Sequence, residues 1–268
     1  MSGPVRLGGM ALSNGVLVHS AENWACAVRD RRGELRVASG RKSFISGEHG
    51  PTALQGPLKL VEVFVLFPTL RRELPDAELP FGRPRVAVTM MLSAAAVRAV
   101  RASRMTPAVQ EALGALVSLV PAAVALRGSA LAEYHGAEHI SIGSYEHGER
   151  REREHERCGS HLVGPLMLTS AAGGLLARRV RGPLQPVARL GAALGAVAAS
   201  VEVFGWMTRN QEHPVAKALA KPGHELQHRL VTAEPSPEQL EVANAALAAC
   251  LALESPNGDG DDAQPPAT

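Results

Sequence analysis

The amino-acid sequence predicts an α+β fold that is mostly helical, in which a small N-terminal antiparallel β unit precedes an apolar helical bundle embedded in or associated with a membrane. Three observations predict this fold class. Short segments rich in β-branched residues, separated by Asn, Asp and Gly, lie between residues 15 and 39, and long apolar stretches recur between residues 58 and 206. A helix start signal follows these stretches near the C-terminal end.

Composition divides the chain into four units. We expect a β-rich unit, an apolar helical region, a C-terminal helical cap and a disordered tail, covering residues 1–55, 56–212, 213–254 and 255–268. In the cap, Ser236 and Gln239 form a capping-box pattern with Pro237 at the first helical position, which predicts a helix from about residue 237. The tail has no residues that could form a core.

The β-rich unit contains three predicted strands, residues 15–20, 24–29 and 34–39. Residues 29–34 predict a hairpin loop between the last two strands. Gly8 and Gly9 are expected to form a turn or to allow a close backbone approach. We expect the unit to be a structural or docking element, because His19 and Glu22 are its only candidates for a functional site.

The helical region begins at Leu58, and Pro68 is expected to kink or stop its first helix. The apolar run of residues 86–97 is too short to span a bilayer. Three longer segments are candidate membrane spans: residues 107–126, 162–177 and 187–206. They are rich in Ala, which is also typical of buried helices in a soluble bundle, so a cytoplasmic soluble protein is the alternative.

Arginines near these segments give opposing signals of membrane orientation. They flank the candidate spans at residues 98–104 and 178–181, and they also occupy the intervening segment at residues 150–157. Re-entrant or interfacial helices on the cytoplasmic face would reconcile these charges. The N-terminus lacks the apolar core of a secretory signal, so we place it in the cytoplasm and the protein at the cytoplasmic membrane.

Overall composition excludes some classes of function. A net charge of +2, with basic residues spread along the chain, gives no electrostatic basis for nucleic-acid binding. The few aromatic residues also make base stacking difficult. Cys26, Cys158 and Cys250 are far apart and odd in number, which indicates a reducing compartment instead of a disulfide framework.

The segment "EYHGAEHISIGSYEHGE", residues 133–149, holds the strongest candidate site. His135 and His139 are four residues apart, so on a helix they project from one face and can bind one ion. Together with Glu138 they have the order H-x-x-E-H of the inverted zinc-peptidase signature. We predict a divalent metal, zinc, bound by the two histidines, with Glu138 as the catalytic base. Since only three positions are fixed, a structural or interfacial histidine cluster is the alternative.

A zinc site with two histidines is incomplete, so further ligands are expected. The candidates are Glu146, His147, His155, Cys158, His161 and Glu202. Glu202 stands alone in an apolar stretch, where an unpaired carboxylate is costly. It is expected to reach either this site or one of two arginines, Arg189 or Arg209.

The geometry of the site depends on where the helices end. If the helix of residues 107–126 continues through Glu133, the two histidines lie at the end of an apolar helix. Their rings should then converge on a polar pocket lined by Glu138. Further polar groups should approach from Glu146, Cys158 or Glu202.

Eight stretches occur in a characteristic order from about Gly8 to Leu253: "GGMALSNGVLV", "AVRDRRGEL", "YHGAEH", "YEHGE", "RCGSHL", "VEVFGWMTRN", "KPGHELQHRLVTAEP" and "QLEVANAAL". In these stretches the chain resembles the DUF1385 family, the YqhQ-like proteins, which are described as candidate metal-dependent enzymes. The most specific stretch is "YHGAEH". The resemblance implies an N-terminal β-rich part followed by membrane-associated helices around this motif.

The resemblance also implies a set of site residues. The family's polar core corresponds to Tyr134, His135, Glu138 and His139, with Glu146, Cys158 and Glu202 behind them. Ile140 stands where the family usually has Lys, so a positive charge has no counterpart here. The helices also have fewer large aliphatic residues, which weakens a full membrane span. The family has no settled reaction, so the resemblance implies a site and a setting but no substrate.

Three functions fit these features. The first is a membrane-associated, metal-dependent enzyme, hydrolytic if it is catalytic, that acts on a small molecule or peptide. The second is a non-catalytic membrane scaffold or assembly factor with a structural histidine or metal cluster. The third is a transport or proton-relay protein that uses Glu202 and the histidines. Membrane lipid or membrane proteins are the expected partners in each case.

Overall fold

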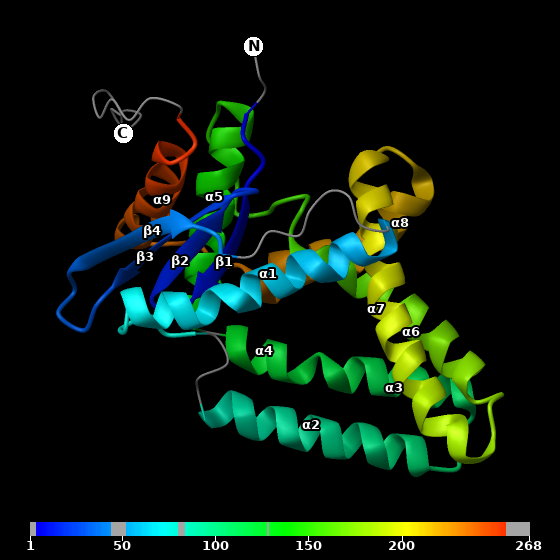
Figure 1. Cartoon of the computed structure of the whole chain (residues 1–268). Helices are drawn as coiled ribbons and strands as arrows, with labels where there is room; N and C mark the ends of the chain where they lie inside the picture. The colour runs from blue at the N-terminus through cyan, green and yellow to red at the C-terminus, as the bar shows by residue number, and fades with distance from the viewer. Residues whose placement is uncertain (1–3, 44–51, 80–83, 128, 256–268) are drawn as a thin grey trace.

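The structure is a computed structural model that describes residues 4–43, 52–79, 84–127 and 129–255 (Figure 1). Its N-terminal part is an antiparallel sheet in which each strand pairs with the next one in sequence. The strands are β1 (Gly8–Leu12), β2 (Gly15–His19), β3 (Asn23–Arg29) and β4 (Leu35–Arg41).

The three predicted strands are confirmed as β2, β3 and β4. The predicted hairpin loop joins β3 to β4, where the Asp30 carboxylate accepts hydrogen bonds from the backbone N–H groups of Arg32 and Glu34. Strand β1 is an addition to the prediction: Gly8 and Gly9 lie in this strand instead of in a turn. Paired glycines weaken a strand pattern because they have no side chain to pack, so the sequence signal was small.

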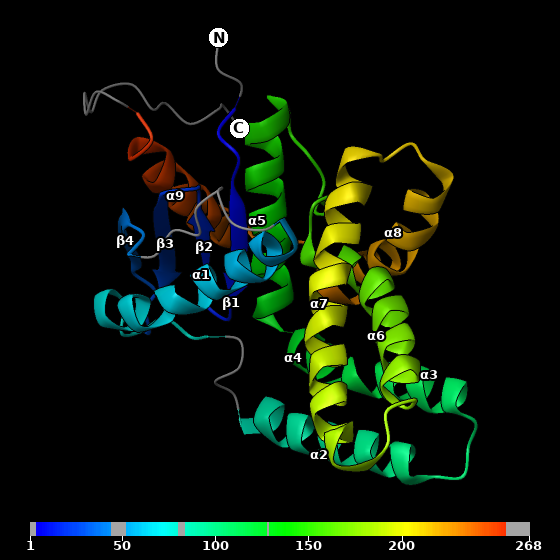
Figure 2. The same cartoon turned by 45° about the vertical axis from the view of Figure 1, so that its right-hand side comes forward.

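The sheet is the middle layer of a three-layer sandwich (Figures 1 and 2). Successive side chains of a strand point to opposite faces. Val16 and Val18 pack against two helices on one face, and Leu17 packs against a third helix on the other face. The two helices are α5 (Ala130–His147) and α9 (Pro237–Ala252), and the third is α1 (Thr52–Glu73).

Two helical hairpins extend from this sandwich (Figure 2). In the first, α2 packs against α3 and α4, which follow one another directly; in the second, α6 packs against α7. A shorter helix, α8, and a π-helical turn, η3, then lead towards α9. The elements are α2 (Pro84–Ala102), α3 (Pro107–Ser118), α4 (Val120–Leu126), η1 (Gly159–Leu162), α6 (Val163–Ala177), η2 (Gly182–Leu184), α7 (Gln185–Arg209), α8 (Pro214–Leu226) and η3 (Gln227–Val231).

The predicted fold class is confirmed: the molecule is mostly helical and has an N-terminal antiparallel sheet. Within the described residues, three segments are long and apolar enough to cross a membrane. They are Val109–Leu126, Gly159–Ala177 and Gly182–Arg209, which correspond to the three segments predicted from the sequence. At most 22% of each of these segments is buried inside the molecule, which is consistent with a membrane location.

The expectation that Pro68 stops the first helix is wrong. Helix α1 starts at Thr52, before the predicted start at Leu58, and it continues past Pro68 to Glu73. Its C-terminal half packs on the sheet through Leu66 and Leu70, and this burial stabilises the helix despite the proline.

The helix of residues 107–126 does not continue through Glu133. It is interrupted at Leu119, because Pro121 has no N–H to donate to the carbonyl of Val117. It ends at Leu126, and a separate helix, α5, begins at Ala130. The candidate site therefore does not lie at the end of an apolar helix.

The predicted C-terminal helix is confirmed as α9. The Ser236 hydroxyl accepts a hydrogen bond from the Gln239 N–H, and the Gln239 side chain accepts one from the Ser236 N–H. Helix α8 packs on α6 and α7, whereas α9 packs on α5 and the sheet. The predicted disordered tail lies outside the described residues from residue 256 onward.

Candidate metal centre

Helix α5 carries the "YHGAEH" motif in its first half and is the most buried helix of the molecule's described part. Ala137 and Ile142 join the core shared with the sheet and α9, whereas the two histidines project from another face. Tyr134, expected in the polar core of the site, lies in this hydrophobic core. Helix α5 is thus held by both the sheet and α9.

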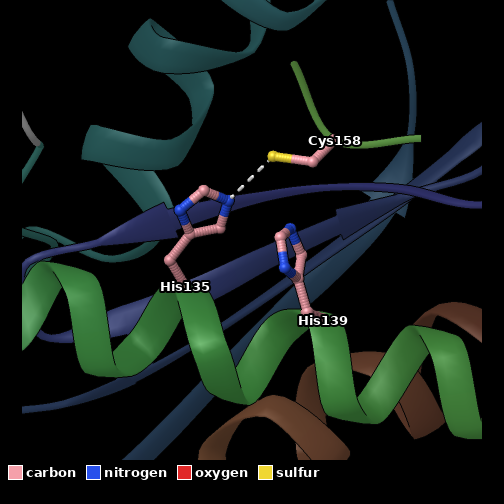
Figure 3. A group of neighbouring side chains, drawn as sticks. All are labelled: His135, His139 and Cys158. Atoms are coloured by element: carbon pink, nitrogen blue, oxygen red, sulfur yellow. Dashed lines mark hydrogen bonds between the residues drawn. The ribbon is translucent and has the colours of Figure 1, made fainter. Parts of the chain in front are cut away.

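His135, His139 and Cys158 form a compact cluster (Figure 3). One ligand atom from each lies within 4.8 Å of the other two, and His135 Nε2 is 3.5 Å from Cys158 Sγ. Neighbouring ligands of a tetrahedral zinc ion are about 3.3–3.6 Å apart, as follows from Zn–N and Zn–S bond lengths. The His135–Cys158 distance lies in this range, and the two imidazoles and the thiol together could hold a metal ion.

Backbone carbonyls orient both imidazole rings. His135 Nδ1 is 3.1 Å from the carbonyl oxygen of Val231, and His139 Nδ1 is 2.7 Å from that of Arg153. Each Nδ1–H donates to its carbonyl, which leaves Nε2 as the free lone pair directed at the cluster. Ligating histidines are typically held by such a second hydrogen bond. Burial lowers the pKa of His139 well below its usual value, so the ring is neutral, as a metal ligand must be.

Glu138 lies between the two rings. Its Oε2 atom is 3.7 Å from His135 Nε2 and 3.8 Å from His139 Nε2. Burial raises the pKa of Glu138 to about 7, and the neighbouring His135 opposes this rise. Strand β1 forms the wall behind it, because a Cβ atom on Gly9 would lie 2.2 Å from Glu138 Oε1. The close backbone approach predicted for the glycine pair therefore occurs at Gly9.

The other predicted ligands lie apart from this cluster. Glu146 forms ion pairs with His155 and Arg157, and His155 in turn contacts the His139 ring with a centroid distance of 5.5 Å. Glu202 lies on α7, partly buried, and forms no hydrogen bond or ion pair with the residues that the structure describes. Ligand roles for Glu146 and Glu202 stay predictions.

Gln227, which the sequence analysis did not single out, organises the segment that carries Cys158. Its fully buried side chain accepts a hydrogen bond from the His155 N–H and donates to the His155 carbonyl and to the Ser160 hydroxyl. Gln227 begins the π-helical turn that ends with Val231, the partner of His135. π-helical turns are frequent at functional sites. An isolated glutamine carries no sequence signal of this kind.

A cleft of about 520 Å³ lies beside the cluster. His155, His161 and Gln227 line it, as do Phe204 and Met207 of α7. The three cluster residues do not line it; His155 stands between the cleft and His139.

Residues 122–253 match the model of a family described as "Protein of unknown function (DUF1385)". The chain belongs to the DUF1385 family. The matched region contains the whole cluster, its backbone partners and Gln227, and it ends with α9. For residues 8–121 of this DUF1385 protein the resemblance stays a prediction. No curated protein and no solved structure gives a significant match to the chain.

Proposed function

We propose that this DUF1385 protein is a metal-dependent hydrolase of the cytoplasmic membrane, with its N-terminus in the cytoplasm. His135, His139 and Cys158 would hold a divalent metal ion, and Glu138 would act as general base. The observation that carries this proposal is the position of Glu138 Oε2, at nearly equal distances from the free Nε2 atoms of both histidines. A carboxylate there can accept a proton from a nucleophile located between the rings.

The chain's own residues would divide the chemistry in the following way. Zinc, when bound, supplies a Lewis acid that activates water. Glu138 accepts the proton, and the β1 backbone at Gly9 holds its side chain towards the histidines. The buried surroundings of Glu138 and His139 exclude bulk water, which strengthens electrostatic interactions at the site.

A substrate would enter by the cleft beside His155. This side chain is held by the Glu146 carboxylate, with His155 Nε2 3.2 Å from Glu146 Oε2. A rotation of the ring away from His139 would connect the cleft with the cluster. The size of the cleft suits a small molecule or a short peptide segment.

A structural metal site in a membrane scaffold is the second candidate. It is supported by the enclosure of the cluster: His139 is 2% exposed, Cys158 is 8% exposed, and neither lines the cleft. In this case Glu138 would be the fourth ligand of a closed site, and the site would resemble structural zinc sites, which lack an open position.

Metal analysis of purified full-length variants tests the proposal. We expect one metal ion per chain in the wild type and loss of this ion in His139→Ala and Cys158→Ala, because each removes a ligand. His147→Ala is the matched control, since His147 is on the same helix but its Nδ1 bonds the carbonyl of Gly143 in its own helix. A wild-type chain that binds no Zn²⁺, Mn²⁺ or Co²⁺ would contradict both candidates.

Glu138→Gln separates the two candidates. If Glu138 is the general base, the variant keeps its metal ion and loses hydrolysis of ester, phosphodiester or peptide substrates that the wild type cleaves. If Glu138 is the fourth ligand, the variant binds the metal more weakly. The Co²⁺ absorption spectrum, which reports the coordination number, should then also change.

A further inference from the structure

We infer that α2 is a fourth membrane-crossing helix and forms a transmembrane hairpin with α3 and α4. The inference rests on the membrane association proposed above but not on the metal site. It starts from the core that β1, β2 and β3 share with α5 and α9. Elements that share one hydrophobic core lie on the same side of a membrane, so the chain between them must cross an even number of times.

Among the described residues, the number of candidate spans between the sheet and α5 is odd. Of the spans found there, Val109–Leu126 alone lies between Arg41 and Ala130, whereas two lie between α5 and α9. Helix α1 cannot supply the second crossing, because Leu66 and Leu70 bind it to the sheet. Segments 44–51 and 80–83 are too short to cross. Helix α2 is the remaining candidate.

Both ends of the first hairpin meet at the shared core. Val86 at the start of α2 and Ala125 at the end of α4 belong to the same buried cluster as Val18, Ile142 and Val242. The hairpin therefore leaves the sandwich and returns to it. In Figures 1 and 2 the turn between α2 and α3 lies far from the sheet.

Helix α2 has suitable length and surface for a crossing. Its 19 residues extend about 28 Å at 1.5 Å per residue, close to the hydrocarbon thickness of about 30 Å. The run from Val86 to Val97 contains no charge, and its exposed side chains include Val88, Met91 and Leu92. By itself the run is too short to span a bilayer, but Arg85 and Arg98 at its ends can extend their guanidinium groups to the interfaces.

Arginines at the turns exclude a re-entrant hairpin. The α2–α3 turn region contains Arg98, Arg101 and Arg104, and the α6–α7 turn region contains Arg178, Arg179 and Arg181. Charged side chains are costly at the bilayer centre, so both turns must reach the far interface. The turns also lie together, because the buried Glu111 carboxylate forms ion pairs with Arg101 and Arg178 at 3.3 and 3.1 Å.

The hairpin also lacks the polar face that an interfacial helix needs. Thr89 and Ser93 are the only polar residues in the central run of α2, and their hydroxyls donate to the carbonyls of Arg85 and Val117. The Val117 carbonyl lacks its usual helical hydrogen bond, because Pro121 has no N–H to donate. Its hydrogen bond from Ser93 satisfies the backbone internally, as hydrocarbon requires.

Figure 2 shows the two hairpins inclined to each other, so both cannot follow the membrane normal. Insertion requires that each is tilted, and tilts of up to about 40° are found among membrane helices. The sheet, α5 with the metal cluster, and α9 would then lie on one side, and both arginine turns on the other.

Side-specific cysteine labelling tests this arrangement. Met105→Cys and Val180→Cys would report the two turns, while Arg31→Cys and Gln211→Cys would report the β3–β4 loop and the α7–α8 connection. The wild type is the background control, because Cys26, Cys158 and Cys250 are buried. A membrane-impermeant maleimide is applied to right-side-out and to inverted vesicles that contain the full chain.

We expect labelling of Met105→Cys and Val180→Cys from one side, and of Arg31→Cys and Gln211→Cys from the other. Labelling of Met105→Cys from the same side as Gln211→Cys would overturn the inference, as would turns that react only after detergent is added. Release of the chain by an alkaline wash would refute the membrane association itself. Metal content, measured on the same preparations, tests the proposed hydrolase separately.

Discussion

The contact between Gly9 and Glu138 shows how a single residue of the sheet shapes the site. The sequence indicated that the glycine pair allows a close approach, but it did not identify what approaches, because the partner is 129 positions further along the chain. The sequence also did not indicate that Lys42 and Glu62 form a pair. These buried side chains lie 3.3 Å apart at the sheet–α1 interface, and Lys42 also contacts His19 Nδ1 at 3.2 Å.

Gly9→Ala should displace the Glu138 side chain, because the new methyl group would overlap its carboxylate. We expect metal affinity or activity to fall about 10–100-fold, as for other changes next to metal ligands. Chelator competition measures the affinity. Gly40→Ala is the control, since its Cβ would make an ordinary 3.5 Å contact with Trp24. If Gly9→Ala and Gly40→Ala bound the metal with equal affinity, β1 would have no role in positioning the site.

His19 should make folding stability depend on pH. Burial, with a smaller contribution from Lys42, lowers its pKa from 6.5 to about 4 in the folded state. Between these values the unfolded chain binds more protons than the folded chain, so stability is lost as the pH falls from about 6.5 to about 4. The loss attributable to His19 is about 3 kcal/mol, from 1.36 kcal/mol per pKa unit.

Unfolding curves of wild type and His19→Asn at several pH values measure this effect, because the Asn side chain does not titrate. The difference between the two free energies of unfolding should shift by this amount across the window and be constant above pH 7. A difference that does not vary with pH would show that His19 titrates normally in the folded protein.

At the scale of elements, features set by neighbouring residues could be predicted, whereas the breaks between consecutive helices could not. The capping box at Ser236 and the loop between β3 and β4 depend on nearby residues, so sequence identified them. The separation of α4 from α5 depends on how α5 packs against the sheet and against α9 beside it, which no local pattern contains. The π-helical turn at Gln227 has the same origin, since its role comes from contacts with residues 155 and 160.

Gln227→Ala should destabilise the segment that carries Cys158. The variant leaves the part-buried His155 N–H without its partner, and an unsatisfied buried group costs up to about 1–3 kcal/mol. We expect a lower Tm and weaker metal binding in the same variant. Gln211→Ala, an exposed amide near the same cleft, should change neither. Normal metal binding by Gln227→Ala would mean that Cys158 is positioned without it.

At the scale of the whole molecule, composition and apolar periodicity were enough to predict the β unit, the helical majority and three of the apolar segments. They could not predict that the sheet lies against α5, because β1, which contacts it, lies more than 100 positions earlier in the chain. For the same reason the sequence could not select Cys158, the third member of the cluster, from the six candidate ligands. Only the folded chain brings residues 150–158 to the histidine face of α5.

If the proposed metal ion is bound, it should stabilise the whole molecule, since its proposed ligands come from two separate segments. A ligand that binds only the folded state at 100 times its Kd adds about 2.7 kcal/mol to stability. Removal of the metal by a chelator should therefore lower the Tm of the wild type. His139→Ala should have a low Tm that the chelator does not change. A wild-type Tm that is insensitive to chelator and to added Zn²⁺ would argue against a bound metal.

During synthesis, the two faces of the sheet are covered at different times, because their helices leave the ribosome at different times. The strands emerge first, and α1 can cover one face of the sheet soon afterwards, but α9, which covers part of the other face, begins only at Pro237. At about 5–20 residues per second, the face with Val16 and Val18 waits on the order of ten seconds or more for this helix. Both hairpins are made during that interval. A nascent chain that stops before α9 would thus leave part of this sheet face uncovered and available to chaperones or to aggregation.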